Sequence, residues 1–277
     1  MKKPDAIEGK PLVLNAAISE RFTKEIKALM RVMHRDVAKG LAECFSAYGQ
    51  DAKNSKGGSL VSQVRILLNA LLDKYNPAFT ILAKKATARM IEQVNQNSAT
   101  SLKMSLKDVS KDLTVKTDFM GERLHEITKS ATEESVGLIK TIPQTYFNAV
   151  QKAVMNSISK DGKGIADLKR FLTPIYQGNE RKAELVALDQ TRKVYQRINS
   201  ERMKQLGIKK FKWLHSGGGA VPRALHVKLS GQIFSFDNPP EIGEMYGQKV
   251  HGLPGDLPNC GCRMSPVFDF EVEDEME

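Results

Sequence analysis

The chain has 277 residues, of which 41% are hydrophobic and 27% charged, so its composition is that of a globular protein and not of a disordered one. Its length allows one large or two modest domains, and we expect two. Three cysteines are too few for an extracellular disulfide framework, and no apolar run suits a signal peptide or a membrane span, so we expect neither.

The formal net charge is +10, although residues 269–277 contain six acidic residues and no basic ones. The rest of the chain is therefore strongly basic. A positive field attracts polyanions, which favours non-specific contact with double-stranded DNA or with an acidic protein ring. A lysine-rich, solvated helix surface explains the same composition, and both interpretations stay open. We predict that the acidic tail, 269–277, is a flexible solvating end.

Residues 1–14 contain Pro4, Gly9 and Pro11, which break a helix, so we predict an extended arm that becomes ordered on a partner. Asn15 is then a suitable N-cap, and apolar residues recur every three or four positions after it. These are Ile18, Phe22, Ile26, Leu29, Met33, Val37 and Leu41. The spacing predicts an amphipathic helix, and the polar stretch 49–59 predicts a loop.

Helical spacing resumes at Leu60 and continues to about residue 97, with Pro77 expected to mark a kink or a new helix. The serine-rich stretch 97–111 is ambiguous. One or two helices are predicted over 118–140, and another over 141–158 with Pro143 in its first turn. A short helix should end at Pro174, and a long one should run from about residue 180 to Gly207, a natural stop.

Beyond Gly207 the pattern changes from helical to irregular. Segments 211–214 and 232–236 alternate in hydrophobicity and are predicted to be short strands, whereas 251–259 is predicted to be a loop. We therefore expect an α+β fold that is mostly α. Long amphipathic helices should fill the N-terminal two thirds (helical domain, 15–178), followed by a small, loop-rich α+β domain over 179–268.

The stretch 213–263 contains three of the five histidines and two of the three cysteines. Thiolates and neutral imidazoles are the ligands that zinc prefers, and four of them close a tetrahedral site. The candidate ligands are His226, His251, Cys260 and Cys262, with Gly261 supplying backbone freedom between the thiols. The alternative is that the cysteines are small buried residues and the histidines bond to backbone. A structural zinc would stabilise a domain with little core of its own.

The order of residues across this stretch resembles the phage Mu F-like head morphogenesis family, whose members are minor capsid proteins of tailed bacteriophages. The resemblance rests on Trp213, Arg223, His226, Gly231, Phe234, the segment FDNPP (236–240), His251, Pro254, Gly255 and the run NCGC (259–262), and upstream on Ala187, Asp189, Gln190, Thr191, Gly207 and Phe211. Two features depart from the family pattern. The flexible stretch GGGA at 217–220 replaces a usual acidic residue, and Gly261 stands where arginine is commoner.

The resemblance implies a structural protein of the phage head that associates with the portal protein and other capsid proteins during assembly. It also implies that the protein is located in the host cytoplasm during assembly and in the interior of the phage head afterwards. We assign no catalytic residue. The alternative is a metal-dependent nucleic-acid-processing enzyme that uses the His/Cys residues, for which Glu241, Glu244 and Asp256 are the nearby candidate bases.

Overall fold

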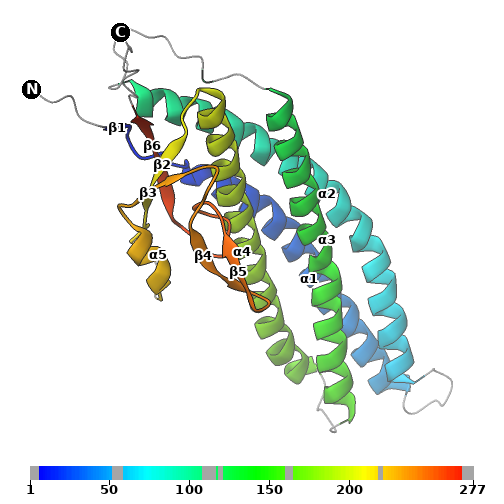
Figure 1. The fold of residues 1–277 in the computed structure, drawn as a ribbon. Coiled ribbons are helices and arrows are strands. Elements are labelled where there is room, and N and C mark those ends of the chain that lie inside the picture. Colours follow the sequence, from blue (N-terminus) through cyan, green and yellow to red (C-terminus); the bar gives the residue numbers. More distant parts are fainter. Residues whose placement is uncertain are drawn as a thin grey trace, which may run out of the picture. The chain divides into compact units, whose positions relative to one another are not determined.

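The computed structural model describes residues 6–51, 59–107, 117, 121–159, 165–217 and 221–269 (Figure 1). The helices are α1 (Ala16–Asp51), α2 (Leu60–Leu106), α3 (Glu122–Ser159), α4 (Ile165–Gln205) and α5 (Ala224–Leu229). The strands are β1 (Ala6–Glu8), β2 (Lys210–Leu214), β3 (Ile233–Ser235), β4 (Glu241–Met245), β5 (Gln248–His251) and β6 (Arg263–Asp269). The predicted class, mostly α with a small strand-containing C-terminal module, is confirmed. Among the described residues, no helix combines the length and apolar content that a membrane span requires.

The residues group into two compact units that each collect distant parts of the chain. Unit 1 comprises Met1–Ile18, Met90–Ala131 and Asp189–Glu277, and unit 2 comprises Ser19–Arg89 and Thr132–Leu188. The division follows packing and not the order of the sequence. The predicted domain ranges, 15–178 and 179–268, stay predictions. The tail residues 270–277 lie outside the described part.

Unit 2 is built from segments of the four long helices. Its core consists of fully or almost fully buried side chains from each of them: Phe22, Ile26, Met30, Met33, Val37, Leu41, Tyr75, Phe79, Ala83, Ile139, Tyr146, Val150, Leu172 and Ala183. Polar contacts join α1 to its neighbours at the edge of this core. The Tyr75 hydroxyl donates to Asp36 at 2.6 Å, and the Lys27 ammonium lies 3.2 Å from Glu184. The amphipathic spacing predicted for α1 is thereby confirmed.

Three prolines that were expected to mark helix starts, kinks or ends lie inside continuous helices. Pro77 is inside α2, Pro143 inside α3 and Pro174 inside α4. A proline removes one backbone hydrogen bond and costs about 3 kcal/mol in a helix interior. Buried side chains on both sides of each proline outweigh that cost, as Tyr75 and Phe79 do around Pro77. The predicted helix boundaries at Pro143 and Pro174 were therefore wrong, and of the two alternatives at Pro77 the new helix is ruled out.

Unit 1 contains a four-stranded antiparallel sheet and a separate hairpin. The strand order in the sheet is β1-β6-β2-β3, and β4 pairs with β5 alone. The strand predicted over 211–214 is β2, whose alternate residues Phe211 and Trp213 are fully buried. At the end of α4, Gly207 has φ +76, and Ile208 donates its N–H to the Met203 carbonyl at 2.9 Å. This left-handed C-cap confirms Gly207 as the helix stop.

The N-terminal segment is extended, as predicted, but it docks on the chain's own unit 1. Residues of β1 pair with β6, and Gly9 and Leu12 donate their N–H groups to the Pro266 and Met264 carbonyls at 2.9 and 3.0 Å. Leu12 is completely buried. The expectation of an arm free to order on a partner is therefore wrong for residues 6–14, because β6 binds the backbone of residues 6–9 and 12, and α2 binds the N–H groups of Lys10 and Val13.

Candidate metal centre

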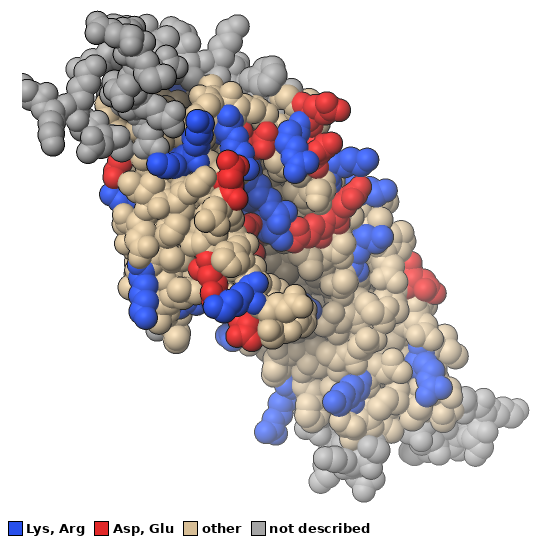
Figure 2. Space-filling view, viewed as in Figure 1, with Lys and Arg blue, Asp and Glu red and all other residues tan. Residues whose placement is uncertain are grey.

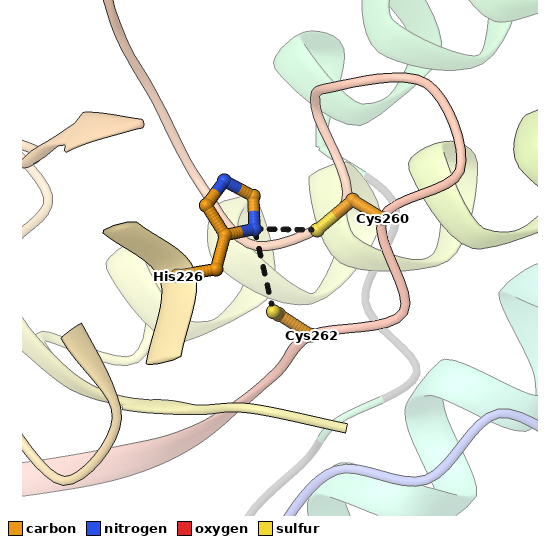
Figure 3. A group of neighbouring side chains, drawn as sticks. All are labelled: His226, Cys260 and Cys262. Carbon is orange, nitrogen blue, oxygen red and sulfur yellow. Dashed lines mark hydrogen bonds between the residues drawn. The ribbon is translucent and has the colours of Figure 1, made fainter. Parts of the chain in front are cut away.

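Three of the four predicted ligands converge in unit 1 (Figure 3). His226 comes from α5, and Cys260 and Cys262 come from the loop that leads into β6. The His226 Nδ1 atom lies 3.5 Å from Cys260 Sγ and 3.6 Å from Cys262 Sγ. All three ligand atoms lie within 4.8 Å of one another, and the three residues are 3–4% exposed. A single ion could contact all three atoms after small side-chain adjustments.

The His226 ring is held in the orientation that a metal ligand needs. Its Nε2 lies 2.9 Å from the Ile242 carbonyl oxygen, so Nε2–H donates there and Nδ1 keeps its lone pair toward the sulfurs. The Trp213 ring packs edge-on against the imidazole, with centroids 5.2 Å apart. A backbone carbonyl on the far ring nitrogen is the usual support of a metal-binding histidine, because it fixes the tautomer and raises basicity.

The two thiols interact strongly with each other. The hydrogen bond from Cys262 lowers the pKa of Cys260, and the same contact, together with burial, raises the pKa of Cys262. The pair therefore loses its first proton easily and keeps the second. The Gly255 N–H lies 3.4 Å from Cys260 Sγ and supports the thiolate. A dication is the species that would release the remaining proton.

The Trp213 indole N–H adds a further positive dipole at the sulfurs. It favours the thiolate form of Cys262, and so does the Ser216 backbone N–H. Among the described residues, the buried indole nitrogen meets no partner at hydrogen-bond geometry. A charged sulfur at Cys262 would therefore stabilise a buried donor that otherwise stays unsatisfied there.

The cysteine loop is fixed from α4 and from the start of α5. Gln196 donates its side-chain N–H to the Cys262 carbonyl at 3.1 Å, and Arg223 donates to the Pro258 carbonyl at 2.8 Å. Asp189 accepts the Asn259 backbone N–H. Burial raises the pKa of Asp189, and the Asn259 N–H opposes that shift. Sequence patterns could not predict that Ile242 binds His226 or that Ser216 favours the Cys262 thiolate, because both interactions are made by backbone groups.

The fourth predicted ligand, His251, is not brought into the group. It is exposed at the end of β5, and its Nδ1 lies 3.0 Å from the Pro239 carbonyl oxygen. Among the described residues, the group of possible ligands consists of His226, Cys260 and Cys262. In the part of the chain that the structure describes, His251 therefore lies apart from the three residues with which it was predicted to form a four-residue site.

The donor set fits zinc. Two sulfurs and one imidazole nitrogen are borderline-soft ligands, and a Cys₂His set is known for zinc, with a fourth position left to water or another ligand. The candidate bases are engaged elsewhere. Glu241 pairs with Lys249 at 2.9 Å, and Asp256 accepts the Leu253 N–H at 2.8 Å. Glu244 is exposed in β4 and does not belong to the group.

Comparison with known proteins identifies the region that contains this site. Residues 148–265 match the family described as "Phage Mu protein F like protein". This part of the chain includes all of α4 and α5, the sheet strands β2 and β3, the hairpin and all three clustered residues. The resemblance to the phage Mu F-like family noted in the sequence is thereby confirmed for residues 148–265.

Two curated proteins are similar to the chain. An uncharacterized protein of Haemophilus influenzae is 25% identical over 97% of this chain and 57% of its own length. Prohibitin-1, mitochondrial, of Arabidopsis thaliana is 22% identical over 60% of this chain and 58% of its own length. The chain thus corresponds to less than two thirds of the length of either relative. No solved structure matches it.

Proposed function

We propose that the chain is a structural protein of a tailed-phage head, a minor capsid protein that acts in head morphogenesis. The observation that carries the proposal is the family match over residues 148–265, which contains the buried His/Cys group. The family match supports the general role, and the buried group supports a structural metal within that part of the chain. A protein that serves as an assembly part needs a rigid, specific surface more than it needs an open reactive site.

In this proposal, zinc at His226, Cys260 and Cys262 acts as a structural staple. The three residues join the six-residue helix α5 to the loop before β6, two short segments that are separated in the sequence by strands β3, β4 and β5. Such segments bury little apolar surface of their own, so a metal would supply stability that packing does not. The zinc would fix the cysteine loop to α5 within unit 1. Its ligands would be His226 Nδ1 and the two sulfurs.

The partners we propose are the portal protein and other capsid proteins, with double-stranded DNA as a non-specific contact. The net charge of +10 supports the DNA contact. Figure 2 shows one face of the molecule, on which lysine and arginine side chains are interspersed with aspartate and glutamate. Several of the basic side chains form ion pairs, as Lys74 does with Asp36 and Arg89 does with Glu25. DNA binding is therefore proposed as a weak accessory property.

The enzyme alternative is less well supported by the same geometry. Hydrolysis at a zinc site requires an accessible coordination position and a nearby base. His226, Cys260 and Cys262 are almost completely buried, and the Glu241 and Asp256 carboxylates are bound to other groups. A structural role for the metal therefore fits the described residues better than a catalytic one.

The test of the proposed role is incorporation into phage particles. In the phage or prophage that encodes the chain, the protein should be found in purified heads, and inactivation of its gene should reduce the yield of filled heads. Complementation with the Cys260→Ser/Cys262→Ser variant should restore yield poorly, whereas His251→Ala should restore it fully. Normal heads without the protein would refute the proposed function.

A further inference from the structure

Asp189 lies on α4 and faces the loop that carries the two cysteines. Both of its carboxylate oxygens accept the backbone N–H of Asn259, at 2.8 and 3.0 Å. Asn259 directly precedes Cys260 in the sequence. The contact spans 70 positions along the chain, so it is a tertiary restraint on the loop and not a local turn.

The restrained residue has an unusual backbone conformation. Asn259 has φ +58, in the left-handed region that residues other than glycine rarely adopt. Asparagine tolerates this region better than most residues, but it still requires surrounding contacts to be held there. The turn is closed by the Cys260 N–H, which donates to the Leu257 carbonyl at 3.1 Å.

The left-handed turn determines where the first sulfur lies. It reverses the chain immediately before Cys260, whose Sγ then lies 3.5 Å from His226 Nδ1 and 3.4 Å from the Gly255 nitrogen. If Asn259 relaxed to a right-handed or extended conformation, the Cys260 side chain would turn away from the imidazole. The sulfur position thus depends on a conformation that Asp189 stabilises.

We propose that Asp189 is a positioning residue of the metal centre. It holds Asn259 in the left-handed conformation and so presets Cys260 as a ligand, and metal affinity depends on it although it does not touch the ion. This inference rests on the proposed metal binding at His226, Cys260 and Cys262. Asp189 thereby acquires a defined task, and its loss should weaken metal affinity because Cys260 would no longer be held in place before the ion binds.

The test compares metal affinity in full-length variants by competition with a chromophoric chelator, using Zn²⁺ alone and Co²⁺ as a spectroscopic probe. Asp189→Ala should weaken Zn²⁺ binding by about 10- to 100-fold, the range typical of residues that support ligands. It should also alter the sulfur-to-cobalt charge-transfer band. Asp189→Asn keeps one acceptor oxygen and should lose less. Asp237→Ala removes an exposed carboxylate of unit 1 and serves as the matched control.

The decisive variant is the double substitution Asp189→Ala/Asn259→Gly. Glycine adopts the left-handed conformation without help, so this variant should recover most of the lost affinity. A simple loss of packing around Asp189 would not be repaired in this way. If Asp189→Ala fails to fold, Asp189→Asn with and without Asn259→Gly makes the same comparison.

The outcomes separate this inference from the function on which it rests. A wild-type chain that binds neither Zn²⁺ nor Co²⁺ would overturn both. Metal binding in the wild type with unchanged affinity in Asp189→Ala would overturn only the role of Asp189. A loss of affinity that Asn259→Gly does not reduce would overturn it as well, because the effect would then not pass through the turn.

Discussion

His226 has two tasks in unit 1, since Nδ1 faces the sulfurs while Nε2–H binds the Ile242 carbonyl. His226→Ala removes the nitrogen ligand and leaves a buried carbonyl unpaired, a loss of about 2–3 kcal/mol. We expect a fall in melting temperature of about 4–12 °C, at about 2–4 °C per kcal/mol. Thermal unfolding followed by circular dichroism measures it.

The control for His226→Ala is His251→Ala. His251 was an equal candidate in the sequence, but it is exposed and bonded to Pro239. Its replacement should change the melting temperature by less than about 2 °C, as surface substitutions usually do. Equal effects of the two variants would contradict the different roles assigned to His226 and His251.

His34 in unit 2 predicts a dependence of stability on pH. Its Nδ1 lies 2.6 Å from the Tyr146 hydroxyl, and its ring stacks on Tyr176 with centroids 4.4 Å apart. Burial lowers the pKa of His34 below its usual 6.5. The unfolded chain therefore binds a proton at His34 more readily than the folded chain does. The stability that neutral His34 contributes is complete above about pH 6.5 and is lost as the pH falls through the pKa that His34 has in the folded chain.

The measurement for His34 is urea unfolding across pH 5 to 8, with His34→Gln as the comparison, since glutamine accepts a hydrogen bond without titrating in this range. The wild type should lose stability toward pH 5 by more than the variant does. Identical pH profiles would mean that His34 contributes nothing to the dependence.

The N-terminal segment is an element whose role in the fold can be tested directly. Leu12 is completely buried in unit 1, whereas the next residue, Val13, is 48% exposed. Leu12→Ala should destabilise the protein by about 2–5 kcal/mol, as leucine truncations in cores do. Val13→Ala, measured in the same denaturant titration, should cost less than about 1 kcal/mol. A small effect of Leu12→Ala would mean that the segment is not anchored as described.

The hairpin of β4 and β5 contains a strained turn. Tyr246 and Gly247 connect the strands with φ values of +54 and +75, and the Tyr246 side chain is 99% exposed. Tight hairpin turns of this kind prefer asparagine before glycine, since bulky residues are disfavoured at positive φ. Because the exposed tyrosine ring adds little packing, Tyr246→Asn should stabilise the fold by up to about 1 kcal/mol. A decrease in stability on chemical unfolding would contradict this conformation.

The elements differ in how far their sequences predicted them. Helix α1 was predictable because Asn15 caps it, accepting the Ala17 N–H at 3.0 Å, and its apolar spacing is regular. Helix α2 was underestimated because Ser98 and Ser105 are buried with tertiary partners, which local propensity does not reveal. Strand β1 was missed since its partner, β6, lies at the other end of the chain.

The site was predictable in its chemistry and only partly in its geometry. Ligand type and proximity in sequence pointed to Cys260, Cys262 and His226, which the fold brings together. The same reasoning selected His251, because residue type does not show which histidine faces the cysteines. Which histidine faces the cysteines depends on the strand register of β4 and β5. It also depends on the backbone carbonyls that bind the two rings, Ile242 for His226 and Pro239 for His251.

At the scale of the whole molecule, the net charge of +10 predicts weak binding to duplex DNA. Affinity should be independent of sequence and fall by about 10-fold or more between about 50 and 200 mM salt, because binding releases counterions. Fluorescence anisotropy with two unrelated duplexes measures both properties. A strong preference for one duplex, or binding that salt does not weaken, would contradict a purely electrostatic contact.

The central claim is that the His226, Cys260 and Cys262 group holds a structural metal. The most direct measurement is the metal content of the purified full-length chain by plasma mass spectrometry, beside the Cys260→Ser/Cys262→Ser double variant. We expect about one zinc per wild-type chain and none in the variant. Absence of metal from the wild-type chain, or equal zinc in both proteins, would contradict it.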